Sequence, residues 1–130
     1  MEFEILYELN ASTQAVYQAW LSSEQHSTMT GGEAIVNSNI GETFTAWDEY
    51  ISGKNITLVP FSKIVQNWRT VEFKENQNDS ILEINLTALN PNKTKLILKH
   101  SELLPEDMKY KQGWIDSYFV PMAFYFDSFL

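Results

Sequence analysis

Apolar and polar residues alternate along several short segments of the chain, as in strands with one buried face. In residues 3–9, Phe3, Ile5, Tyr7 and Leu9 alternate with a largely acidic set. Alternation, or a run of β-branched and aromatic residues, predicts further strands at residues 34–36, 42–51, 55–60, 62–73, 81–89 and 94–100. Ser52-Gly53-Lys54 is expected to be a hairpin turn within this series. The pattern thus predicts about seven strands.

Helical spacing replaces alternation between the first predicted strand and residue 33. Residues 10–21 place Trp20 on an apolar side, and Ser12 is suited to the N-cap. Ser22 begins a capping-box spacing, which predicts a second short helix as far as about Met29. The pair Gly31-Gly32 is expected to end it.

The longest helical pattern covers residues 105–130. Its apolar stripe consists of Trp114, Tyr118, Met122, Tyr125 and Phe129, and it is widened by Ile115, Phe119, Phe126 and Leu130. Pro105 suits a first helical turn, where its missing N–H would have no partner in any case. Pro121 removes a hydrogen bond to the carbonyl of Ser117, so a kink is expected there.

This order of elements predicts an α+β fold formed by one domain over residues 1–130. A strand, two helices and an antiparallel series of strands give a curved sheet with one apolar face. The long C-terminal helix is the segment available to cover that face. Because a helix fills the middle of a curved sheet better than its ends, we expect a cavity between them.

Composition narrows the possible partners. The net charge of −8 would repel nucleic acid and anionic membranes, and no run of residues suits a membrane span. The chain has no cysteine and no basic segment followed by an apolar run at its start, so we expect a cytoplasmic location.

Short motifs distributed from about Glu4 to about Phe126 resemble one family. They are Gly41-Glu42-Thr43-Phe44, Ile51-Ser52-Gly53, Leu58-Val59-Pro60, Lys63-Ile64-Val65, Asn67-Trp68-Arg69, Thr94 and Gln112-Gly113-Trp114 followed by Tyr118-Phe119. In this order and spacing they are similar to the C-terminal domain of activators of the Hsp-ninety ATPase, within the START-like (helix-grip) superfamily.

The resemblance implies a curved antiparallel sheet that grips a long C-terminal helix. It also implies a possible Hsp-ninety-type chaperone as partner. Eukaryotic activators carry a separate N-terminal domain that makes the principal chaperone contact, and we expect this chain to lack it. The fold itself does not fix a function, because one fold hosts many.

Several residues are candidates to line the expected cavity and bind a small apolar ligand: Gln66, Trp68, His100, Trp114, Tyr118 and Met122. His100 shares a strand face with Leu96 and Leu98, so it is expected to point inward and to offer a polar group to a ligand in the cavity. The alternative is a buried His satisfied by a backbone group. The aromatic residues, Trp47 included, could equally be core.

Two residues are candidates for contact with a protein partner. Arg69 follows Trp68 on a predicted strand, so the two point to opposite faces, and Arg69 could either contact a partner or pair with an acidic group of the chain. Phe129 could lie beyond the sheet in an exposed apolar patch. A one-residue error in register would reverse the assignment of Trp68 and Arg69.

The sequence contains no arrangement typical of catalysis or metal binding. The two His residues are far apart and there is no Cys, so no zinc site is predicted. Asp48 and Glu49 are neighbours on a predicted strand and would point apart. We therefore expect a non-enzymatic domain without a cofactor, which either binds a small apolar ligand or contacts an Hsp-ninety-type ATPase.

Overall fold

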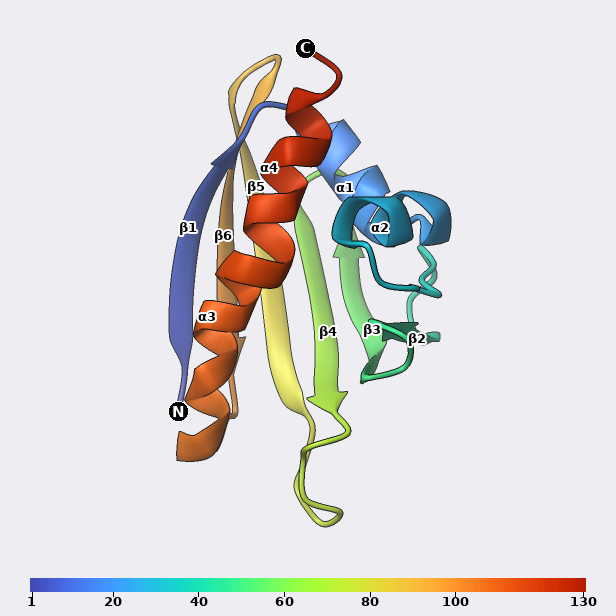
Figure 1. The fold of residues 1–130 in the computed structure, drawn as a ribbon, viewed down its shortest axis with the longest axis vertical. Helices are drawn as coiled ribbons and strands as arrows, with labels where there is room; N and C mark the ends of the chain where they lie inside the picture. Colours follow the sequence, from blue (N-terminus) through green and yellow to red (C-terminus); the bar gives the residue numbers. More distant parts are fainter.

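A computed structural model describes residues 1–130, and its main feature is one antiparallel sheet (Figure 1). The strand order is β1-β6-β5-β4-β3-β2 in a 6-stranded sheet. The strands are β1 (Phe3–Leu9), β2 (Thr43–Ala46), β3 (Ile51–Val59), β4 (Lys63–Thr70), β5 (Ser80–Asn90) and β6 (Lys93–Ser101). Most consecutive strands are neighbours, and β1 joins the sheet beside β6.

Two short helices follow β1, as predicted. Helices α1 (Thr13–Leu21) and α2 (Ser23–Thr30) are capped by the hydroxyls of Ser12 and Ser22, which accept from backbone N–H groups two or three residues into each helix. Gly31 ends α2 in the left-handed conformation, with φ of 87°. In Figure 1 both helices lie beside the C-terminal helix, on the same side of the sheet.

The C-terminal helix crosses the sheet but changes its winding along the way. It comprises the 3-10 turn η1 (Pro105–Lys109), α3 (Tyr110–Trp114), the π-helical turn η2 (Ile115–Phe119) and α4 (Val120–Asp127). In the π turn the N–H of Val120 donates to the carbonyl of Ile115, five residues earlier. The π turn therefore lies just before Pro121. Because Pro121 has no N–H to donate, the helix accommodates the missing hydrogen bond by widening in the preceding turn.

This π turn changes which apolar residues face the sheet. One extra residue in a turn rotates the following helix by about 100°. Phe126, predicted at the widened edge of the stripe, is consequently 4% exposed, while Tyr125, predicted on the stripe itself, is only half-buried. Helix α4 ends at Asp127, and Phe129, which the helical spacing placed on the stripe and which was also a candidate for an exposed patch beyond the sheet, is 72% exposed.

The sheet has six strands, and the predicted strand at residues 34–36 is absent. Ile35 forms only an isolated bridge with Thr45. The backbone of Ala34 and Val36 instead bonds with the side chains of α2: the hydroxyls of Ser27 and Ser23 each accept from an N–H and donate to a carbonyl there. These contacts satisfy the backbone without a sheet ladder.

The predicted hairpin at residues 52–54 was also wrong. The turn between β2 and β3 lies at residues 47–50, and Gly53 pairs with Phe44 and Trp68 inside the sheet. A Cβ at Gly53 would collide with the backbone carbonyl of Asn67 and would lie 2.7 Å from the ring of Phe44. Glycine is required there by close approach, not by a turn.

The core lies between the sheet and the helices. On β4, residues Ile64, Gln66 and Trp68 face inward, with exposed fractions between 1% and 3%. The predicted strands at residues 62–73, 81–89 and 94–100 correspond to β4, β5 and β6, and their alternation is reproduced as alternating burial. No helix of the structure is long and apolar enough to span a membrane.

Candidate aromatic pocket

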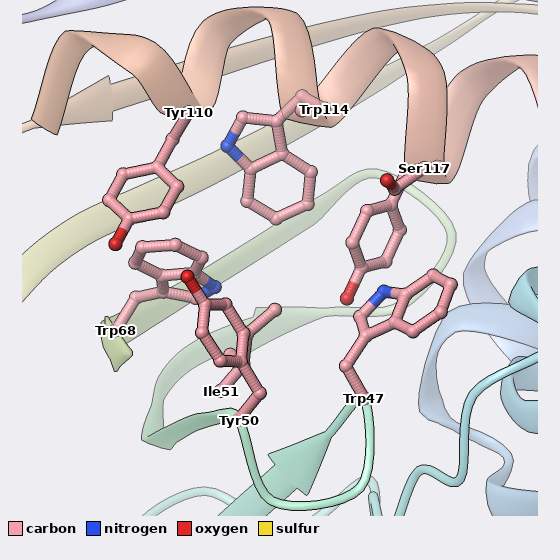
Figure 2. Close-up of a pocket in the computed structure, with 9 residues that line it drawn as sticks. Trp47, Tyr50, Ile51, Trp68, Tyr110, Trp114 and Ser117 are labelled. Carbon is pink, nitrogen blue, oxygen red and sulfur yellow. The ribbon is translucent and has the colours of Figure 1, made fainter. Parts of the chain in front are cut away.

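A pocket of about 350 Å³ lies between the turn at residues 47–50, strand β4 and the C-terminal helix (Figure 2). Its floor is formed by the buried residues Ile51, Trp68, Trp114 and Tyr118, and the half-buried residues Trp47, Tyr50, Tyr110, Gly113 and Ser117 form its upper walls. No charged side chain lines it. This is a mostly aromatic cavity with hydroxyl and indole N–H groups as its polar atoms.

The C-terminal helix presents one face to the pocket. Tyr110, Gly113 and Ser117 follow the spacing of neighbours on a helix surface, with Trp114 one turn after Tyr110. A Cβ at Gly113 would meet no atom within 4 Å, so this glycine leaves open space on the pocket side of the helix.

The turn at residues 47–50 supplies the opposite wall in an unusual backbone conformation. Trp47, Asp48 and Glu49 have φ values of 52°, 57° and 71°, in the left-handed region that disfavours side chains. The carboxylate of Asp48 accepts from the N–H of Glu33, and the Asp48 N–H donates to the Glu33 carbonyl. A Cβ at Gly32 would lie 2.5 Å from the Trp47 indole, so Gly32 lets that ring pack closely. These contacts hold the turn.

Beneath the pocket, a chain of hydrogen bonds fixes the orientation of Trp114. Its indole N–H donates to Nδ1 of His100 (3.0 Å), and His100 Nε2 is 2.7 Å from the hydroxyl of Ser80. The Ser80 hydroxyl donates to the Trp68 carbonyl (2.9 Å). An indole can only donate, so Nδ1 must be the unprotonated nitrogen and Nε2–H donates to Ser80.

Burial also keeps His100 neutral. Its side chain is fully buried, and burial lowers its pKa from 6.5 to about 3. The imidazole therefore acts as a fixed connector between the Trp114 indole and Ser80. The predicted inward orientation is confirmed, and the partners that satisfy His100 are side chains, not a backbone group.

At the outer end, two tyrosine hydroxyls have partners of their own. The Tyr110 hydroxyl lies 2.6 Å from the hydroxyl of Thr70, and the Tyr50 hydroxyl donates to Glu72. Glu72 also accepts from Lys109 (2.8 Å). Burial, followed by the hydrogen bond to Glu72, raises the pKa of Tyr50, so the phenol stays protonated.

The predicted cavity residues divide into two groups. Trp68, Trp114 and Tyr118 line the pocket, whereas Gln66, His100 and Met122 lie outside the lining set, in the buried core. The Gln66 amide donates to Oδ1 of Asn55 (2.8 Å). Met122 is fully buried, so the π turn ahead of Pro121 does not open a cavity beside it.

The two partner-contact candidates are both on the surface side of the structure. Arg69 faces outward, opposite Trp68, and its guanidinium bonds Asp79 (2.7 Å) and the carbonyls of Lys74 and Gln77. Arg69 thus fastens the loop between β4 and β5. Phe129 is exposed beyond the end of α4 and makes an edge contact with Tyr125.

The sequence analysis did not identify five of the lining residues: Tyr50, Ile51, Tyr110, Gly113 and Ser117. The helical members could have been found from their spacing relative to Trp114. Tyr50 could not, because residues 42–51 follow a strand pattern and no glycine marks the left-handed turn.

Comparison with known proteins supports the fold and identifies the family. The family model "Activator of Hsp90 ATPase homolog 1-like protein" matches residues 10–124. The human "Activator of 90 kDa heat shock protein ATPase homolog 1" is 29% identical over 110 residues, which cover 83% of this chain. The chain spans 32% of the length of that human relative.

Solved structures share the same architecture. An HSP90 activator from Plasmodium falciparum superposes with a TM-score of 0.82 at 22% identity, covering 92% of this chain and 91% of that one. A protein from Mesorhizobium loti reaches 0.82 at 13% identity, with 98% of both chains covered. The Aha1 dimer from Colwellia psychrerythraea gives 0.74 at 14% identity, with 88% of both covered. Together with the family match over most of its length, the sheet and gripped helix show that this chain belongs to the Activator of Hsp90 ATPase homolog 1-like family.

Proposed function

We propose that this chain is a non-catalytic START-like domain that binds a small, mostly apolar ring compound in the aromatic pocket. The observation that carries the proposal is a cavity of about 350 Å³ in which 7 of the 9 lining residues are hydrophobic. Ligand sites are typically concave, mostly apolar and supplied with a few placed polar groups. A pocket of this size and lining fits that description.

The walls of the pocket are held in place by hydrogen bonds within the chain. Trp114 is fixed by His100, Tyr110 by Thr70, and the turn at residues 47–50 by its bonds to Glu33. A preformed site avoids the loss of free energy that ordering its walls would require on binding. This supports reversible binding of a compound that fits the existing space.

The first experiment is a backbone-amide NMR titration against fatty acids, sterols and flat aromatic compounds. The proposal expects saturable shifts at Ile51, Gly113 and Tyr118, with little change in the strand β1. No saturable shift in the pocket across the whole panel would contradict the proposal.

A matched pair of variants at Gly113 tests the location. Gly113→Leu extends a side chain from the pocket face of the helix and should abolish the shifts, while the helix gains propensity. Gly113→Ala adds only a methyl group to open space and should leave binding within about threefold. Equal binding by both variants would place the ligand elsewhere.

A second candidate is contact with an Hsp90-type ATPase, which is favoured by the family match and by the name of the human relative as an activator of this ATPase. Its test is the ATPase rate of an Hsp90 chaperone with and without this domain. Phe129→Ser probes the exposed C-terminal end without disturbing the core. Stimulation that survives Gly113→Leu but not Phe129→Ser would favour this second function, and no stimulation would contradict it.

A further inference from the structure

The indole N–H of Trp47 is buried in the pocket wall and has no hydrogen-bond partner. Buried polar groups in native proteins nearly always have one, so an unpaired buried donor calls for an explanation. In Figure 2 the nitrogen edge of the Trp47 ring is turned toward the other lining side chains. The donor therefore faces the cavity side of the wall, beneath neighbouring lining atoms that an entering acceptor would displace.

A second donor lies at the same end of the pocket. The rings of Trp47 and Tyr118 have centroids 6.4 Å apart and meet at 75°. Burial raises the pKa of Tyr118, and the Trp47 N–H beside its hydroxyl opposes that rise. The indole and the hydroxyl are close to each other but outside the geometry of a full hydrogen bond. Because the phenol stays protonated at neutral pH, its O–H remains available to donate.

We propose that the pocket takes a neutral, planar ring compound with a carbonyl oxygen, which accepts hydrogen bonds from Trp47 Nε1 and the Tyr118 hydroxyl. The inference rests on the proposed function, because it names the ligand class for the same pocket. A carbonyl oxygen has two lone pairs and so matches two donors. The aromatic walls contact the faces and edges of the ring system.

The absence of positive charge in the pocket favours a ligand with a neutral carbonyl group over one with a carboxylate. No Lys, Arg or His lines the pocket, and the whole chain carries a net charge of −8. A carboxylate would lose its hydration on entry and find no cationic partner, which disfavours its binding. A neutral carbonyl oxygen loses much less hydration free energy on entering the pocket.

The test compares indanone with indane, two flat bicyclic compounds that differ by a carbonyl in place of a methylene group. Each is titrated into the intact protein, and the four Trp indole N–H resonances are followed by NMR. The Trp47 resonance is assigned by its loss in Trp47→Phe. Indanone should bind about threefold to tenfold more tightly than indane and should move the Trp47 resonance downfield.

The variant completes the comparison. In Trp47→Phe the preference for indanone over indane should fall to below about twofold, whatever the change in absolute affinity. Tyr118→Phe keeps the ring, removes only the hydroxyl, and provides the same comparison if Trp47→Phe does not fold.

The outcomes separate the two proposals. Equal binding of indanone and indane, with an unmoved Trp47 resonance, would overturn the carbonyl assignment and leave the apolar binding function standing. A preference for indanone that survives unchanged in both variants would also overturn it. Failure of both compounds and of the wider panel to bind would defeat the proposed function and this inference together.

Discussion

The indole N–H of Trp114 donates to Nδ1 of His100, and this single bond determines the protonation of the imidazole. Since Nδ1 accepts, the ring proton lies on Nε2 and is donated to Ser80. A doubly protonated ring would present an N–H to the indole N–H, with no acceptor between them. The wall of the pocket and the neutral state of His100 therefore depend on each other.

Stability should fall as the solution is acidified below about pH 6.5, the ordinary pKa of His100. With a folded pKa of about 3, the unfolded chain binds a proton between those values that the native chain does not. His100 alone should lower the free energy of unfolding by about 2 kcal/mol from about pH 7 to about pH 5. Urea unfolding across this pH range measures the loss of stability. Burial also lowers the pKa of His26, so His26 should add to the same loss as the pH falls.

The matched variant is His100→Gln, whose amide can still accept from Trp114 and donate to Ser80. It should show a shallower loss of stability between about pH 7 and about pH 5, because only His26 then contributes in this window. The lowered pKa values of Glu72 and Glu106 act nearer their ordinary value of 4.5. An unchanged slope in the variant would show that His100 does not carry the effect.

The same substitution at two glycines should have opposite effects. Gly53→Ala forces a Cβ against the Asn67 carbonyl and the Phe44 ring and should lower the unfolding free energy by about 3 kcal/mol. Gly113→Ala meets no atom within 4 Å in a helix and should raise it by about 0.5–1 kcal/mol. Denaturant unfolding of both variants checks the pair. Equal effects would mean that Gly53 is not closely approached.

Because the π turn determines which side of α4 faces the sheet, truncation of two phenylalanines in α4 should have different effects on stability. Phe126→Ala removes a ring that is 4% exposed and should cost about 3–5 kcal/mol of stability. Phe124→Ala removes one that is 75% exposed and should cost less than about 0.5 kcal/mol. Thermal unfolding of the two variants distinguishes them. The reverse order would require an uninterrupted α-helix through residues 115–119.

The left-handed turn offers a stabilising substitution. Glu49 has φ of 71°, and its exposed side chain has no hydrogen bond. Glu49→Gly should raise the free energy of unfolding by about 0.5–1 kcal/mol, because glycine adopts this conformation without the clash of a Cβ. Asp48→Gly should show no such gain, since it loses the bond to the Glu33 N–H. Chemical denaturation of both gives the comparison.

The sequence predicted the elements whose pattern is local. Alternation in residues 62–73, 81–89 and 94–100 corresponds to strands β4, β5 and β6, and Ser12 and Ser22 cap their helices as expected. Inward placement of Trp68 and outward placement of Arg69 follow from the same alternation. These features are set by neighbours in sequence.

The errors arose where distant contacts override the local pattern. The hairpin was predicted at Gly53 because glycine is common in turns. In the structure a glycine is needed there because Asn67 and Phe44 approach its backbone too closely for a Cβ. The apolar stripe of the C-terminal helix was predicted with one uniform helical period, and the π turn before Pro121 changes which residues after it face the sheet. The turn at residues 47–50 contains no glycine, so its left-handed backbone, and with it Tyr50 as a pocket wall, was not visible in the sequence.

The turn at residues 47–50 supplies Trp47 and Tyr50 to the pocket while standing outside the ladder of β4, β5, β6 and β1. Loops held on a rigid scaffold tolerate exchange of residues better than the scaffold does. Relatives that inherit the same sheet and helix can thus diverge in what they recognise by replacing a few turn residues. Under the proposed function, ligand preference can change through the turn residues while the sheet and helix residues that form the pocket floor stay the same.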